Sequence, residues 1–140
     1  MSRIDRARLD GAALPFHIVV PPRFSDLDTI GHINNVAVAL ILQEGRIRML
    51  HANELADGRQ LHLVVASLHI EFAADLLYGT PIEVACGILE IGRTSFRVGQ
   101  VARQDGTAGA YAEVVLVTRD GGGPVPVPEA QRAKLEQLRI

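Results

Sequence analysis

The segment from Arg23 to Arg46 places chemically active side chains directly before a run of apolar residues. Two aspartates, a Gly-His pair and two asparagines precede the apolar stretch Val36–Leu42. A carboxylate therefore stands within a few residues of an expected helix N-terminus, where backbone N–H groups lack intrahelical partners and favour negative charge. This combination suits acyl transfer, because Asp28 can act as a base or a nucleophile while the N–H groups hold an oxyanion.

The two aspartates also allow other interpretations. Asp26-x-Asp28 could belong to a divalent metal site, but hard cations require more oxygen ligands than this loop offers. An Asx-turn or a helix-capping loop explains the same residues equally well, because aspartate is common in both. From spacing alone these interpretations stay open, and we expect no bound metal.

Other combinations of base and nucleophile have less support. We rank His32 below Asp28 as a general base, because no nucleophile stands beside it to form a pair. The chain contains no Gly-x-Ser-x-Gly motif, so a Ser-His-Asp triad is unsupported. Cys86 lies on the apolar side of an alternating segment, which is typical of a core residue. Arg93, in a predicted turn, is either a solvated arginine or a phosphate ligand.

The element that must position Asp28 is a helix over about residues 34–52. Asn34 or Asn35 suits its N-cap, and the all-apolar stretch Val36–Leu42 predicts burial on every side. The second half of the helix is amphipathic, and Gly45 weakens it or marks a bend there.

Two charged residues of this helix stand too close in sequence to pair along one helix face. Glu44 and Arg46 are separated by a single residue, whereas helical neighbours are three or four apart. We therefore expect one or both to make tertiary or intersubunit contacts.

The rest of the chain has the patterns of strands joined by short turns. The expected strands cover residues 16–23, 61–73, 81–91, 95–103 and 108–119, and a short helix covers 129–138. Turns such as Asp105-Gly106 favour hairpins, so the sheet should be antiparallel. One sheet with one apolar helix predicts an α+β fold in which the sheet curls around the helix. Its open edges favour pairing with a second copy.

Length and composition restrict the class of protein. A chain of 140 residues, 48% hydrophobic and 21% charged, is expected to form one globular domain, with a polar lead-in over residues 1–13 and a tail over 120–140. The net charge of −2 offers no basic surface, and four Phe, two Tyr and no Trp leave little for base stacking. We therefore expect no nucleic-acid partner.

The single cysteine and the hydropathy pattern indicate the cellular compartment in which the protein is expected. One thiol cannot form an internal disulfide, and no Cys/His cluster has zinc spacing. The first residues lack the long apolar region of a secretory signal, and no apolar run approaches a bilayer span. A cytoplasmic location without membrane insertion is expected.

Taken together, these motifs resemble the signature of hotdog-fold acyl-CoA thioesterases of the 4-hydroxybenzoyl-CoA thioesterase type. That signature is an aromatic residue, Asp-x-Asp, Gly-His-hydrophobic-Asn-Asn and a helix with Glu-x-Arg. The chain supplies it as Phe24, Asp26, Asp28, Gly31-His32-Ile33-Asn34-Asn35 and Glu44/Arg46. The likeness continues through Val65–Phe72, Tyr78-Gly79, Ile82–Val84, Ile91–Phe96, Asp105-Gly106 and the closing VPVPE. It covers roughly residues 15–130.

The resemblance implies a five-stranded antiparallel sheet wrapped around a central helix, in homodimers that form a continuous sheet or in homotetramers. It implies an acyl-CoA substrate and no cofactor beyond the CoA of that substrate. Asp28 falls on the catalytic position, and the backbone N–H near Asn35 on the group that polarises the thioester carbonyl. The substrate-binding positions fall on Gly31, His32, Asn34 and Arg93, the last of these toward a CoA phosphate.

One departure from the family pattern keeps a second function open. Relatives usually have aromatic residues along the central helix, where this chain has Val38 and Ile41, so the pocket floor is expected to be aliphatic. A non-catalytic hotdog protein that binds an acyl thioester or a protein partner is therefore the alternative to a hydrolase. A hotdog hydratase has the least support, because its paired Asp and His motif is not found.

Overall fold

The structure is a computed structural model that describes residues 3–55 and 62–140. Its elements follow the chain as α1 (Arg6–Gly11), β1 (Phe16–Val20), a 3-10 turn η1 (Phe24–Asp26), α2 (Asn35–Ala52), β2 (His62–Phe72), β3 (Ile82–Ile91), β4 (Ser95–Gln104), β5 (Thr107–Asp120), β6 (Gly123–Pro124) and α3 (Glu129–Gln137). These bounds agree with the predicted segments to within a few residues. The expected start of the second strand, at Leu61, lies outside the described residues.

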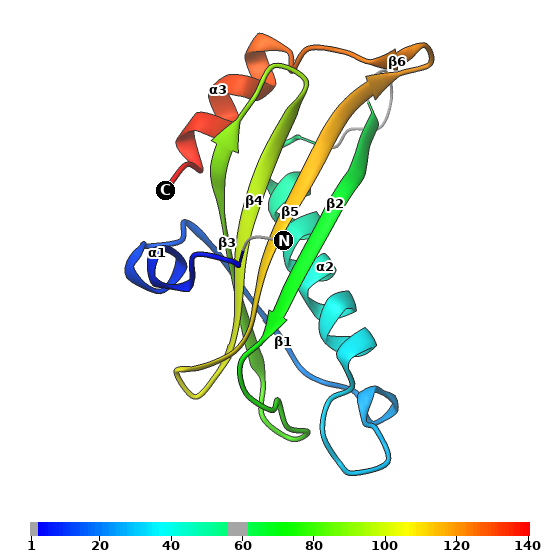
Figure 1. The fold of residues 1–140 in the computed structure, drawn as a ribbon, viewed down its shortest axis with the longest axis vertical. Coiled ribbons are helices and arrows are strands. Elements are labelled where there is room, and N and C mark those ends of the chain that lie inside the picture. Colours follow the sequence, from blue (N-terminus) through cyan, green and yellow to red (C-terminus); the bar gives the residue numbers. More distant parts are fainter. Residues whose placement is uncertain (1–2, 56–61) are drawn as a thin grey trace.

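A single antiparallel sheet curls around α2 (Figure 1). Its strand order is β1-β3-β4-β5-β2, and the two-residue β6 pairs with the end of β5. The predicted five-stranded antiparallel sheet around a central helix is therefore confirmed. Residues 120–140 were expected to form a tail, and the structure adds the short β6 hairpin in the glycine-rich segment after Asp120.

The β4–β5 hairpin shows how local sequence sets the strand pairing. Asp105 and Gly106 both have positive φ angles, 50° and 78°, as a tight two-residue turn requires. Glycine meets this demand without a steric cost, and aspartate tolerates it better than most residues. This turn sets the antiparallel pairing of the two central strands.

Helix α2 begins at its N-cap, Asn34, whose side chain accepts a hydrogen bond from Ala37 N at 2.8 Å. It then packs mainly against β1, β3 and β4. Gly45 allows this approach, because a Cβ atom at that position would collide with Val84 of β3. The helix runs through Gly45 to Ala52, so this glycine serves close packing and does not end the helix.

The expectation that Val36–Leu42 is buried on every side is wrong. Ala37, Val38, Ile41 and Leu42 are buried, but Val36 is 66% exposed and Leu40 50%. The reason is geometric, because the curled sheet covers one side of α2 and leaves the opposite side without cover. An apolar stripe on a helix therefore remains open in the single chain.

The N-terminal segment is more ordered than the predicted polar lead-in. Ile4, Leu9 and Leu14 are buried against the outer face of the sheet, where they meet residues such as Leu89 and Val101. These strand residues alternate with those that face α2, so the sheet is covered on both sides here. Helix α1 lies across this face in Figure 1.

Candidate active site

The loop before α2 is held in place by Asp26. The residue is 5% exposed, and its side chain accepts hydrogen bonds from Arg23 N at 2.7 Å and Arg23 Nη2 at 2.9 Å. Burial alone would raise the pKa of Asp26, but the hydrogen bonds and charge of Arg23 outweigh it, so the pKa lies below its usual value. The Asp26 main-chain oxygen in turn accepts from Asn34, so this residue supports the loop.

Asp28 combines a turn contact with an available carboxylate oxygen. Its Oδ1 accepts hydrogen bonds from Ile30 N at 2.9 Å and His32 N at 3.0 Å, which is the Asx-turn arrangement. Gly31, with φ of 87°, supplies the left-handed backbone that this tight loop requires. Within the described part of the chain Oδ2 accepts no hydrogen bond, so it remains free for chemistry.

The start of α2 presents unpaired N–H groups beside this carboxylate. Asn34 caps the N–H of Ala37 with its side chain and that of Val38 with its carbonyl. The N–H groups of Asn35 and Val36 donate to no residue in ranges 3–55 and 62–140. They are the groups that a helix N-terminus offers to a developing negative charge.

A pocket of about 390 Å³ brings these groups together. Its lining includes Asp28, His32 and Asn35 from the loop and helix start. Val38 contributes an aliphatic surface from α2, and Phe72 lines the pocket at the end of β2. The arrangement places a carboxylate, an aliphatic surface and free N–H groups around one space, a combination that acyl transfer can use.

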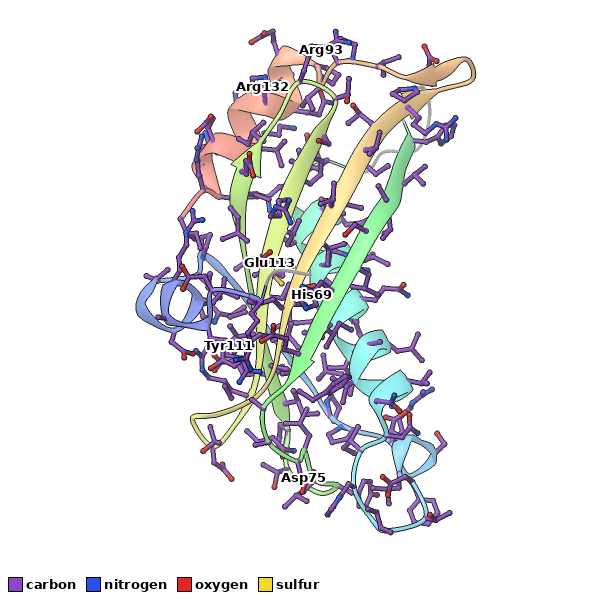
Figure 2. The ribbon with its side chains drawn as sticks, in the orientation of Figure 1. His69, Asp75, Arg93, Tyr111, Glu113 and Arg132 are labelled. Carbon is purple, nitrogen blue, oxygen red and sulfur yellow. The ribbon has the colours of Figure 1, made fainter. Side chains whose placement is uncertain are left out.

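Asp75 also lines this pocket, and the sequence analysis missed it. It lies in the connection after β2 (Figure 2), with its Oδ1 3.6 Å from His32 Nδ1. No motif marks it, because only the folding of that connection brings it beside a loop more than forty residues earlier in the chain. His32 therefore has an acidic neighbour in Asp75.

The wall of the pocket opposite α2 depends on a close backbone approach. The N–H groups of Ala73 and Ala74 donate to Gly109 O at 2.8 and 3.2 Å. A Cβ atom at Gly109 would collide with Leu76, which also lines the pocket. Glycine at this point of β5 lets the connection after β2 pack down and close that side.

Arg93 is not part of this pocket in one chain. It occupies the β3–β4 turn, where its carbonyl accepts from Val127 N at 2.8 Å. Figure 2 shows it at the end of the sheet opposite Asp75, which marks the pocket. The structure thus brings Asp28, Gly31, His32, Asn34 and Asn35 together and leaves Arg93 apart.

Arg46 makes a tertiary contact, as expected, whereas Glu44 pairs locally within α2. Glu44 pairs with Arg48 at 2.9 Å on the exposed side of α2. Arg46 is buried, and its Nη1 donates to Gln100 Oε1 at 3.1 Å. Gln100 Nε2 donates in turn to the carbonyl of Leu42 at 2.7 Å, so a series of hydrogen bonds between polar groups crosses the core.

The core prediction for Cys86 is confirmed. Its side chain is fully buried, with Sγ 3.2 Å from Gln100 Nε2. Burial raises the pKa of the thiol to about 11. A neutral thiol in the core is a poor nucleophile, so Cys86 is not a candidate catalytic residue.

The described residues offer neither a cluster of metal ligands nor a membrane-spanning helix. Across residues 3–55 and 62–140 no group of three or more His, Cys, Asp or Glu side chains gathers as metal ligands would. Asp26 and Asp28 do not converge, because Arg23 holds one and backbone N–H groups hold the other. None of the described helices is both long and apolar enough to cross a membrane.

Comparison with known proteins identifies the class to which this fold and site belong. Residues 22–135 match the thioesterase-like superfamily. The chain therefore belongs to the thioesterase-like superfamily, and its curled sheet around α2 is the hotdog fold of that group. A search among curated proteins found no match.

Solved structures agree with this assignment. The chain is 32% identical to a thioesterase from Thermus thermophilus complexed with coenzyme A and Zn, with a TM-score of 0.81 over 89% of this chain and 94% of that one. A predicted thioesterase from Bacillus stearothermophilus is 29% identical, with a TM-score of 0.81 over 89% and 96%. A thioesterase superfamily protein from a Jannaschia species is 25% identical, with a TM-score of 0.79 over 91% and 86%.

Proposed function

We propose that this protein hydrolyses an acyl-CoA thioester to a free acid and CoA, as thioesterases of the 4-hydroxybenzoyl-CoA type do. The observation that supports this most directly is the free Asp28 Oδ2 beside the unpaired N–H groups at the start of α2. The N–H of Asn35 would hold the carbonyl oxygen as negative charge develops on it. Gly31, His32 and Asn34 would shape the loop that receives the thioester.

Asp28 has two chemical routes to the same products. As a nucleophile, its carboxylate attacks the thioester carbon, the C–S bond breaks, CoA leaves as thiolate, and water hydrolyses the resulting mixed anhydride. As a general base, it takes a proton from water, which attacks the same carbon before the C–S bond breaks. Turnover in water labelled with oxygen-18 separates them, because only the anhydride route can place the label in the Asp28 carboxylate.

The likeness to the Thermus thermophilus thioesterase, whose structure contains coenzyme A, supports CoA as the carrier of the acyl group. The acyl end would contact Val38 and Phe72, which line the pocket. An aliphatic surface in place of helix aromatics favours an acyl group that does not depend on ring stacking.

A homodimer would complete the site. Strand β2 ends the strand order, and Val64, Val65, Leu68 and Phe72 are between 42% and 52% exposed along it. Open strand edges with apolar side chains favour pairing with a second copy. If the β2 strands of two copies paired in antiparallel fashion, the end of one sheet that carries Arg93 would lie beside the partner's end with Asp28. Light scattering should give a dimer or a tetramer, and a monomer mass at micromolar concentration would refute this.

The test of the activity is release of free CoA thiol across a panel of CoA thioesters with aliphatic and aromatic acyl groups. We expect at least one to be cleaved by the wild-type protein and far more slowly by Asp28→Asn. Tight binding of a thioester without any cleavage across the panel would instead favour the non-catalytic hotdog protein.

A further inference from the structure

A second pocket, of about 230 Å³, lies between α2 and β2 at the end of β2 away from Asp28. Leu50 of α2, Leu63 of β2 and Leu116 of β5 give it apolar walls. The polar side chains in its lining are Gln43, Arg46 and His51, and no carboxylate of the described residues lines it. As far as its described lining goes, the pocket is thus an apolar space with a cationic group and no anion.

Arg46 is an unusual residue to find in such a place. It is 4% exposed, and its one hydrogen bond to the described residues is donated to the neutral amide of Gln100. A buried guanidinium normally pairs with a carboxylate, because an unpaired buried charge is costly. The nearest acidic residue along the helix, Glu44, faces the other side of α2, where it lines a cavity with Arg23.

The remaining nitrogens of Arg46 are directed at accessible space. Among the described residues no buried side-chain nitrogen lacks a hydrogen-bond partner. Nε and Nη2 of Arg46 donate no hydrogen bond to residues 3–55 or 62–140, and the pocket beside β2 is the accessible space that Arg46 lines. Two free donors of one guanidinium suit a carboxylate, which accepts both at once.

We propose that this pocket holds a carboxylate at the far end of the acyl group, so that the preferred substrates are CoA thioesters of dicarboxylic acids. The inference rests on the proposed thioesterase function. Both pockets are bounded by α2 on one side and β2 on the other, and Leu68, 48% exposed, lies between them along β2. Within one chain Arg46 stands about three helical turns, or 16 Å, beyond Asn35, so a long acyl group would join the sites. The antiparallel β2 pairing proposed above would bring this pocket beside the partner's end with Asp28, where a shorter acyl group would reach it.

The test compares matched pairs of CoA thioesters that differ only in a methyl or a carboxylate at the acyl terminus, over short and long chains. The measured quantity is the ratio of kcat/KM for the carboxylate-ended ester to that for the methyl-ended ester. We expect this ratio to exceed one at some chain length in the wild-type protein. Arg46→Met should lower it on the order of 10- to 100-fold, the size expected for lost hydrogen bonds to a charge.

Two further variants serve as controls. Arg46→Lys keeps the charge but loses the bidentate hydrogen-bonding geometry, so its kcat/KM ratio should lie between those of the wild type and Arg46→Met. Arg48→Met makes the same change at an exposed arginine of α2 and should leave the ratio unchanged. If Arg46→Met does not fold, the wild-type ratio still decides, and a preference for methyl-ended esters at every length overturns the inference.

Other results separate this inference from the proposed function. If methyl-ended esters are cleaved and Arg46→Met leaves the kcat/KM ratio unchanged, the result supports a thioesterase and refutes the carboxylate pocket. If Arg46→Met lowers the fraction of dimer but leaves the kcat/KM ratio unchanged, a second copy of the chain neutralises Arg46. That result also refutes the carboxylate pocket. If no ester is cleaved, calorimetric binding of the same matched pairs replaces kcat/KM, and equal affinities overturn the inference.

Discussion

The main-chain oxygen of Asp26 accepts two hydrogen bonds from Asn34, from its backbone N at 2.9 Å and from its side-chain Nδ2 at 3.0 Å. Asn34 is the N-cap of α2, and its Oδ1 holds the N–H of Ala37. The first aspartate of the pair is therefore tied to the helix start, and the loop between them presents the second. Asp26 thus supports the loop, and Asp28 lines the pocket.

Asp26→Asn should destabilise the protein by about 1–3 kcal/mol, because an amide cannot replace the charged acceptor that holds Arg23. The folded pKa of Asp26 lies below the unfolded value of about 3.9, so its stabilising effect is present above that pH and is lost as the pH falls through the folded pKa. Chemical denaturation of wild type and variant at neutral and acidic pH measures this.

The gap in unfolding free energy between the two proteins should therefore shrink as the pH drops below about 4. Asp120→Asn, at the exposed end of β5, is the matched control and should change stability by less than about 0.5 kcal/mol. A gap that is constant with pH would show that Asp26 does not act through its charge.

Asp28→Asn should reduce kcat on the order of 10² to 10⁴ or more without loss of structure. Asparagine can keep the Asx-turn, because its Oδ1 can still accept from Ile30 N and His32 N, while the free carboxylate oxygen is lost. Thiol release under saturating substrate gives kcat, and circular dichroism checks the fold. Asp26→Asn should cost less activity, and near-wild-type turnover in Asp28→Asn would remove Asp28 from the mechanism.

Gly45→Ala should destabilise the protein by about 1–3 kcal/mol, although alanine is the better helix former. The added methyl group would collide with Val84 of β3, so α2 or the strand must move. Thermal unfolding measures the change. Gly11→Ala in α1 meets nothing within 4 Å and should be neutral or stabilising. A higher Tm for Gly45→Ala would mean that the α2–β3 contact is looser than described.

Arg93→Ala should raise KM for the acyl-CoA more than it lowers kcat, since a phosphate contact changes little between ground and transition states. The effect requires the dimer, because Arg93 lies at the far end of the sheet from Asp28 in one chain (Figure 2). Steady-state kinetics measure it, with Arg139→Ala, an arginine paired with Glu136 near the C-terminus, as control. An unchanged KM would exclude Arg93 from substrate binding.

The sequence alone determined the elements and the composition of the loop site. Hairpin turns such as Asp105-Gly106 act between neighbouring residues, and the N-cap role of Asn34 depends on the three residues that follow it. Because these signals are local, they can be interpreted from the sequence without knowledge of the fold. The motif from Asp28 to Asn35 could be placed at a helix start for the same reason.

Only the tertiary structure decided what surrounds that motif. Asp75 joins the pocket through a connection far along the chain, and Arg46 meets Gln100 across 54 positions. Val36 is exposed because the sheet covers one side of α2, although its apolar side chain predicted burial. Contacts between distant segments depend on how the sheet curls and where glycines such as Gly45 let backbones approach, and neither is encoded in the periodicity of any one segment.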